Sequence, residues 1–321
     1  MFVLAAVLVT QAAAPIFRFE TDGFWLNLHH YLYVLGRLDA RMQPDSGREA
    51  ALAALPDQEV GLKTLSEAER QIWREAVTFY AAGPSKMDAV IDAKLVEVTN
   101  QLKRAPSEKP ASVLKIDRAI AATLDRAAPI YRRAWWPRHR AANRDWLEDM
   151  QGSVKRYGPQ VLAYVTRVYQ EPWEDGGYPV NVAAFSNWAG AYSTSFNLLV
   201  ISSMSPGNRG LYGFELTFHE AMHQWDQGID ARMLRLSKTY GLRFNDLLSH
   251  AMIFYTTGEA VRSVVPAHTP VAELAGIWKG RMGAFKPALD AHWKPYLEGK
   301  TTLDEALVAL MKATTKIEAA L

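Results

Sequence analysis

The sequence predicts an α+β protein that is predominantly helical, with a small mixed sheet just before a helix that carries a metal-binding motif. The chain has 321 residues, of which 49% are hydrophobic and 22% charged, the ordinary range for a globular protein with a large core. Apolar residues recur at helical spacing over most of residues 20–155 and again from residue 211 onward. Between these regions, three short apolar runs are separated by turn residues, as in a small sheet.

Residues 15–155 are expected to form a helical N-terminal region. Ser66 and Glu69 form a capping box for a helix that runs to Gly83, and residues 88–104 and 114–126 show similar periodicity. Arginines alternate with tryptophans over 132–146. Because the formal net charge is only +2, we interpret them as solvated arginines on helices with aromatic core faces, broken near Pro137, and expect no nucleic-acid partner.

The composition changes at residue 156, where we place the boundary of a second region, 156–321. Residues 170–179 contain proline, glycine and acidic residues and predict a loop. Strands are predicted at 180–185, 191–194 and 198–202, followed by a chain-breaking segment at 205–208. The following residues are again helical in pattern.

The first fourteen residues are typical of a secretory signal. An unbroken apolar run at 2–9 is followed by the small residues Ala12, Ala13 and Ala14. This run is too short to cross a bilayer, which takes roughly 20 helical residues. We therefore expect a signal peptide at 1–14, no integral membrane span and a secreted or periplasmic location. Because no Lys or Arg precedes the run, the alternative is a buried segment of a cytoplasmic protein.

A metal-binding pattern, H-E-x-x-H, lies at His219, Glu220 and His223. Residues four apart on a helix share a face, so the two imidazoles can converge on one ion, with the glutamate placed to accept a proton from water. The chain has no cysteine and eight histidines, so a metal must be held by His, Asp or Glu. Three such ligands and an open position suit a catalytic Zn²⁺. The motif helix is expected to stop at Gly228.

The third ligand is expected on a helix that includes residues 248–262. Its two candidates, Glu259 and His250, are nine residues apart and point to opposite sides of one helix. We favour Glu259, because Tyr255 and Arg262 share its face as groups that support a ligand or stabilise an oxyanion. His250 is the alternative.

Two further roles have candidates. Tyr255 is the first choice for stabilising a tetrahedral oxyanion, and His292 and Tyr296 are weaker choices. Asp226 follows His223 by three residues and is a candidate for orienting that histidine through its second ring nitrogen. A simple helix-end carboxylate is the alternative for Asp226.

This constellation resembles the gluzincin zinc metallopeptidases of the thermolysin and aminopeptidase type, in which a second helix supplies a Glu ligand. The resemblance covers about residues 180–265. It implies a zincin-like core, His219 and His223 as zinc ligands, Glu220 as general base and Glu259 as third ligand. It also implies zinc-dependent hydrolysis of peptide bonds in a peptide or protein substrate. The sequence around Glu259 reads Gly-Glu-Ala-Val-Arg-Ser and departs from the N-E-x-x-S/D pattern of thermolysin-like helices.

The resemblance further implies that the strand before the motif lies along the substrate backbone. Gly190, Ala191 and Tyr192 occupy that position, and an ordinary hairpin is the alternative. Two other functions remain open from the sequence. One is a zinc hydrolase acting on a non-peptide amide, and the other is a non-catalytic zincin-fold protein that binds peptides or partners.

Overall fold

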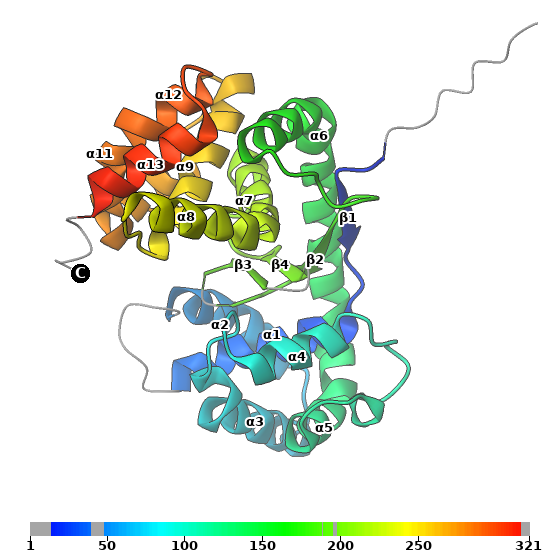
Figure 1. The fold of residues 1–321 in the computed structure, drawn as a ribbon. Coiled ribbons are helices and arrows are strands. Elements are labelled where there is room, and N and C mark those ends of the chain that lie inside the picture. Colours follow the sequence, from blue (N-terminus) through cyan, green and yellow to red (C-terminus); the bar gives the residue numbers. More distant parts are fainter. Residues whose placement is uncertain (1–13, 40–47, 188, 195–197, 316–321) are drawn as a thin grey trace, which may run out of the picture.

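A small sheet lies between two layers of helices in the computed structural model, which describes residues 14–39, 48–187, 189–194 and 198–315 (Figure 1). The predominantly helical α+β class with a small mixed sheet is thereby confirmed. The expected signal peptide lies outside the described residues except for its last position, Ala14.

The sheet has the strand order β1-β2-β4-β3. β1 (Phe17–Glu20) pairs in parallel with β2 (Tyr178–Ala183), which pairs in parallel with β4 (Leu198–Ser202). β3 (Ala191–Thr194) is antiparallel to β4 and forms one edge. The strands expected at 191–194 and 198–202 are confirmed. The strand expected at 180–185 begins and ends two residues earlier, as β2. β1 was not predicted.

The N-terminal layer contains five helices, α1 (Phe24–Asp39), α2 (Arg48–Leu62), α3 (Glu67–Ala82), α4 (Ala93–Leu102) and α5 (Arg118–Ala134). The predicted capping box is confirmed: Ser66 Oγ accepts from the Glu69 amide, and Glu69 Oε2 accepts from the Ser66 amide. α4 begins later than expected because Asp92 caps it: Asp92 Oδ1 accepts from the backbone amides of Lys94 and Leu95.

The long helix α6 (Trp136–Tyr169) runs beside both layers. It starts with Pro137 in its first turn, so the break predicted there is confirmed. The expected boundary at 155/156 falls inside this continuous helix. Trp135 and Trp146 are fully buried, whereas Arg138 and Arg140 pair with carboxylates, as expected for aromatic core faces with outward cations.

The C-terminal layer contains the remaining helices, α7 (Gly210–Met222), α8 (Asp226–Tyr240), α9 (Leu247–Val264), α10 (Val271–Leu274), α11 (Lys286–Ala288), α12 (Lys294–Leu297) and α13 (Leu303–Thr314). The motif helix α7 ends at Met222, and a 3₁₀ turn at His223–Trp225 leads into α8. Gly228 therefore lies inside α8, and the helix stop predicted there is wrong.

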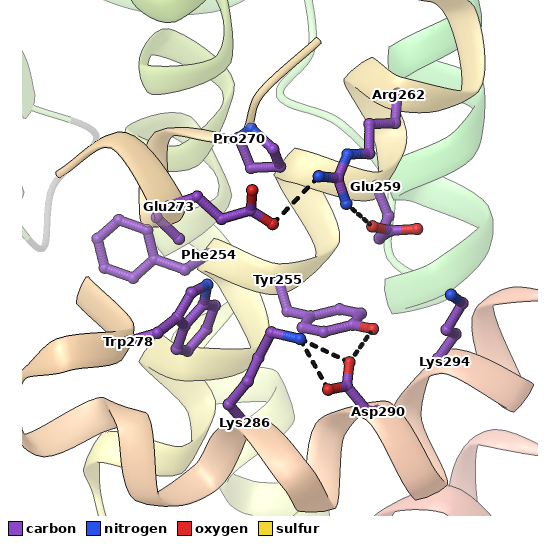
Figure 2. Close-up of a pocket in the computed structure, with 11 residues that line it drawn as sticks. Phe254, Tyr255, Glu259, Arg262, Pro270, Glu273, Trp278, Lys286, Asp290 and Lys294 are labelled. Carbon is purple, nitrogen blue, oxygen red and sulfur yellow. Dashed lines mark hydrogen bonds and ion pairs between the residues drawn. The ribbon is translucent and has the colours of Figure 1, made fainter. Parts of the chain in front are cut away.

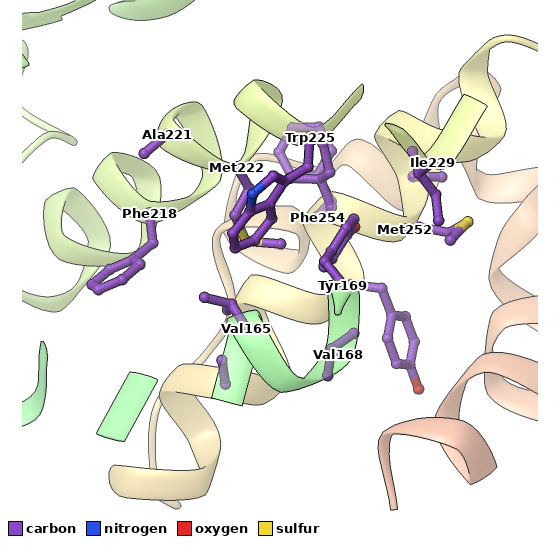
Figure 3. Close-up of a cluster of buried hydrophobic side chains, with 14 of the residues drawn as sticks. Val165, Val168, Tyr169, Phe218, Ala221, Met222, Trp225, Ile229, Met252 and Phe254 are labelled. Atoms are coloured by element: carbon purple, nitrogen blue, oxygen red, sulfur yellow. The ribbon is translucent and has the colours of Figure 1, made fainter. Parts of the chain in front are cut away.

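The sheet separates two hydrophobic cores. Leu199 and Ile201 of β4 belong to the core under the C-terminal layer, while Leu198 and Val200 belong to the core of the N-terminal layer. Successive side chains of a strand point to opposite faces, so the consecutive apolar residues 198–201 of β4 contribute to both cores. Figure 3 shows part of the first core, where side chains of α6, α7, α8 and α9 meet. Among the described residues, no helix combines the length and apolar character needed to cross a bilayer.

Candidate metal centre

Three histidines converge in the C-terminal layer. His219, His223 and His250 each offer a ring nitrogen, and these atoms all lie within 4.8 Å of one another. The Nε2 atoms of His219 and His250 are 3.2 Å apart. Two nitrogens bound tetrahedrally at Zn–N distances of about 2.0–2.1 Å would be separated by roughly 3.3–3.4 Å. The three histidines could therefore hold a metal ion, and the spacing of the His219–His250 pair is close to that expected at zinc.

The three rings are brought together by the crossing of α7 and α9. His219 lies in the last turn of α7, His223 opens the 3₁₀ turn after it, and His250 lies in the first turn of α9. The ring centroids of the three pairs are 5.2, 5.2 and 4.9 Å apart. Phe254, one turn after His250, packs on His219 with centroids 3.9 Å apart. Phe254 also stacks on His250, with centroids 4.9 Å apart, so one aromatic ring packs on two of the three imidazoles.

Glu259 does not join this group. α9 is one helix through both residues, so His250 and Glu259 point to opposite sides, as expected, but the face of His250 is the one turned to α7. Glu259 Oε1 accepts from Arg262 Nη1 at 3.1 Å and lines a separate cavity of about 110 Å³ (Figure 2). The structure thus brings His250, the alternative candidate, to His219 and His223, and leaves Glu259, the favoured one, apart from them.

The expected oxyanion groups also lie elsewhere. Tyr255 Oη donates to Asp290 Oδ1 at 2.7 Å and lines the same smaller cavity as Glu259 (Figure 2). Tyr296 is buried and donates to the Val168 carbonyl, and His292 lies in a π-helical turn. Neither Tyr255 nor these alternatives line the cleft of the histidines, whereas Tyr212 does. Tyr212 lies seven residues before His219, a spacing that places both on one face of α7.

Glu220 is buried against the edge strand. Its Oε2 lies 2.8 Å from Ser193 Oγ, which is also 2.6 Å from the Glu220 carbonyl oxygen. Burial raises the pKa of Glu220, and the nearby His223 and the Ser193 hydroxyl offset this only in part. A carboxylate with a raised pKa suits general-base chemistry near neutral pH. Sequence reasoning missed Ser193, although the alternation of a strand places it on the same face as Ala191.

Asp226 holds His223 by its second nitrogen, with Oδ2 2.7 Å from Nδ1. Burial lowers the pKa of His223, but the hydrogen bond and charge of Asp226 outweigh it, so the pKa is raised overall. A carboxylate on Nδ1–H fixes the tautomer and leaves Nε2 to face the other two rings. This contact is the one that the spacing of the two residues suggested.

The site opens into a cleft of about 650 Å³ along the edge strand β3. The Gly190 carbonyl accepts from the Ser202 amide at 2.8 Å, which makes this a hydrogen-bonded pair of the antiparallel ladder. Because bonded and non-bonded pairs alternate, the backbone of Tyr192 faces β4, while that of Ala191 and Ser193 faces away from it.

The three residues expected along the substrate therefore differ in role. Ala191 directs its N–H and C=O toward the open edge. The Gly190 carbonyl accepts two hydrogen bonds, from the Ser202 amide and from Asn208 Nδ2 (2.8 Å), and so anchors the start of β3. The Tyr192 side chain points into the N-terminal layer, where its hydroxyl lies 2.8 Å from His30 Nε2.

Comparison of the chain with protein-family models, with curated proteins and with solved structures found no match.

Proposed function

We propose that this protein is a zinc-dependent hydrolase of peptide bonds, in which His219, His223 and His250 hold the metal. The observation that carries the proposal is the convergence of the three imidazoles beside a buried glutamate in an open cleft. Three neutral imidazoles with an open fourth position are a donor set typical of catalytic zinc. We also propose that the protein has a zincin-like core related to that of the gluzincins. In this chain His250 takes the place of the glutamate ligand of that family.

The residues around the metal have distinct tasks. A bound zinc would supply Lewis acidity and lower the pKa of water toward about 7. Glu220 accepts the proton of the attacking water and passes it to the leaving amine. Ser193 holds the Glu220 carboxylate in position, and Asp226 holds the His223 ring. Tyr212, which lines the cleft, is the candidate for the oxyanion in place of Tyr255.

The edge strand favours a peptide over another amide. Ala191 and Ser193 direct backbone donors and acceptors toward the cleft, and an extended peptide can pair with them as an added strand. A non-peptide amide would leave these groups without a function. Peptide binding along β3 also places the substrate beside Glu220, because Ser193 touches that residue.

The test is Glu220→Gln in the full chain, assayed for zinc content and for hydrolysis of casein, with Glu148→Gln on the exposed face of α6 as the matched control. We expect Glu220→Gln to keep its zinc but to lose roughly 10²–10⁴-fold in rate, the usual contribution of a general base. The control should match the unmodified protein. Full activity of Glu220→Gln would refute the proposed mechanism, and a zinc-loaded protein without peptidase activity would indicate another amide or a binding role.

A further inference from the structure

The smaller cavity beside α9 is a second candidate binding site. It has a volume of about 110 Å³ and lies between α9 and the short helices that follow it in the chain (Figure 2). Phe254 lines both this cavity and the cleft of the three histidines, so the two spaces are neighbours. The histidines themselves and Glu220 line only the cleft. A molecule in the smaller cavity would therefore bind without touching the metal centre.

The cavity is lined by equal numbers of positive and negative side chains. They are Arg262, Lys286, Lys294, Glu259, Glu273 and Asp290. A simple anion would meet the three carboxylates, and a simple cation would meet the three positive charges, so repulsion offsets attraction for both. A molecule that carries both charges can place each of them beside side chains of the opposite sign. The charge balance therefore favours a zwitterion.

Two cations of this cavity retain unused hydrogen-bond donors. Arg262 has five N–H groups and uses three of them, donating to the His268 carbonyl and to one oxygen each of Glu259 and Glu273. Lys294 makes no hydrogen bond or ion pair with any residue that the structure describes (Figure 2). A planar carboxylate matches the fork of a guanidinium, and an ammonium group adds a second charge to hold it. Arg262 and Lys294 can therefore receive a carboxylate.

The two glutamates retain unused acceptors. Glu259 and Glu273 each bond to Arg262 through Oε1, and Oε2 of neither has a partner within the described part of the chain. An ionised carboxylate is an acceptor only, and each of its oxygens has two lone pairs. The free oxygens of both glutamates can therefore accept N–H groups of an ammonium.

The volume of the cavity limits its occupant to a small molecule. A cavity of roughly 150 Å³ is large enough for one benzene molecule. A space of about 110 Å³ therefore suits a molecule of roughly five or six non-hydrogen atoms, the size of glycine or alanine. The uncharged part of the lining includes Phe254, Pro270, Ala272 and Trp278. These side chains suit a hydrogen atom or a methyl group at the α-carbon better than a polar side chain.

We propose that the smaller cavity binds a small free α-amino acid as a zwitterion, with its carboxylate on Arg262 and Lys294 and its ammonium group on Glu259 and Glu273. An α-amino acid carries both charges on one carbon and so presents them together in a small volume. The inference needs neither zinc nor catalysis, and it goes beyond the proposed peptidase function.

The first experiment measures the binding of glycine and L-alanine to the purified full chain by calorimetry. We expect saturable binding of one molecule per chain. Acetate and methylamine, which carry one charge each, should bind more weakly by roughly tenfold or more, because each lacks one set of charge-assisted hydrogen bonds. Free leucine and tryptophan should be excluded by their size. No binding of glycine and alanine, or equally tight binding of acetate, methylamine or tryptophan, would overturn the inference.

Two lysine variants test whether the ligand lies in this cavity. Lys294→Gln removes the lining cation that has no protein partner, and Lys312→Gln removes one on α13 outside the lining. Both lysines are exposed, so neither substitution creates a buried void. We expect Lys294→Gln to weaken glycine binding roughly tenfold, the effect of losing a hydrogen bond between charged groups. Lys312→Gln should bind glycine as the unmodified protein does.

A third variant tests the orientation of the ligand. Glu273→Gln removes a negative charge from the expected ammonium position while keeping the size of the side chain. It should weaken the binding of glycine and strengthen that of acetate, because acetate has no ammonium group and is repelled by the carboxylate. Circular dichroism checks that each variant is folded. Glycine binding that is unchanged in both Lys294→Gln and Glu273→Gln would place the ligand elsewhere, such as on the metal, and would overturn the inference.

Discussion

His219 Nε2 and His250 Nε2 lie 3.2 Å apart although 31 residues separate them in the chain. A ring nitrogen of His223 completes the group, and the three ring nitrogens all lie within 4.8 Å of one another. The contact makes the site a product of how α9 packs across α7. α7 carries His219, the 3₁₀ turn after it carries His223, and the packing of α9 brings His250 to them.

Asp226→Asn should weaken zinc binding by about 10–100-fold, the usual effect of losing a carboxylate behind a ligand histidine. The amide is a weaker acceptor for the Nδ1–H of His223 and no longer adds negative charge to the ring. Zinc affinity is measured by titration against a competing chelator. Asp145→Asn, on the exposed surface of α6, should bind zinc as the unmodified protein does, and an equally tight Asp226→Asn would remove the orienting role.

Ser193→Ala should slow hydrolysis by roughly 10- to 100-fold, since a hydrogen bond to a charged group is worth about 1.5–3 kcal/mol. The Ser193 hydroxyl lowers the pKa of Glu220. Its removal should raise that pKa and move the acidic limb of the pH–rate profile to higher pH. A purely structural role would lower the rate without moving the limb. Ser263→Ala on α9, whose hydroxyl donates to a backbone carbonyl, is the matched control.

The stability of the protein should fall as the pH falls from 6.5 toward 4, partly because of His30. Its Nδ1 lies 2.8 Å from the Leu26 carbonyl, so Nδ1 carries the proton and Nε2 accepts from Tyr192. Burial lowers the pKa of His30 to about 4, against an ordinary value of 6.5. The unfolded chain therefore binds a proton in this range that the folded chain does not, at up to about 1.4 kcal/mol per pH unit.

Urea unfolding at several pH values checks this dependence. His30→Asn should show a flatter decline below pH 6.5 and a lower stability at pH 7, because the buried Tyr192 hydroxyl loses its acceptor. His292→Asn, in the C-terminal layer, should retain the slope of the unmodified protein. An unchanged slope in His30→Asn would mean that other groups carry the pH dependence.

Local sequence patterns predicted much of the fold. The capping box at Ser66, the helix break at Pro137 and two of the strands depend on neighbouring residues, and the structure has them in place. β1 was missed because it is a short strand whose partner, β2, lies far along the chain, whereas β3, equally short, pairs with the next strand in the sequence. A strand this short is defined by the pairing and not by its own sequence.

The candidate site also depends on contacts between distant parts of the chain, which local sequence patterns do not predict. Periodicity correctly put His250 and Glu259 on opposite sides of α9, but both sides of this helix are largely buried. When two sides of a helix are apolar and buried, the sequence pattern does not show which side packs against which neighbouring helix. Tyr255 and Arg262 favoured the side of Glu259, which faces away from His219 and His223: Arg262 pairs with Glu259, and Tyr255 donates a hydrogen bond to Asp290.

The most direct test of the central claim is the zinc content of His250→Ala compared with Glu259→Ala, measured by mass spectrometry on folded, purified protein after dialysis. The geometry predicts that His250→Ala loses its zinc, because two imidazoles remain, while Glu259→Ala retains a stoichiometric amount. Circular dichroism confirms that both variants are folded. Retention of zinc by His250→Ala together with its loss from Glu259→Ala would contradict the three-histidine site.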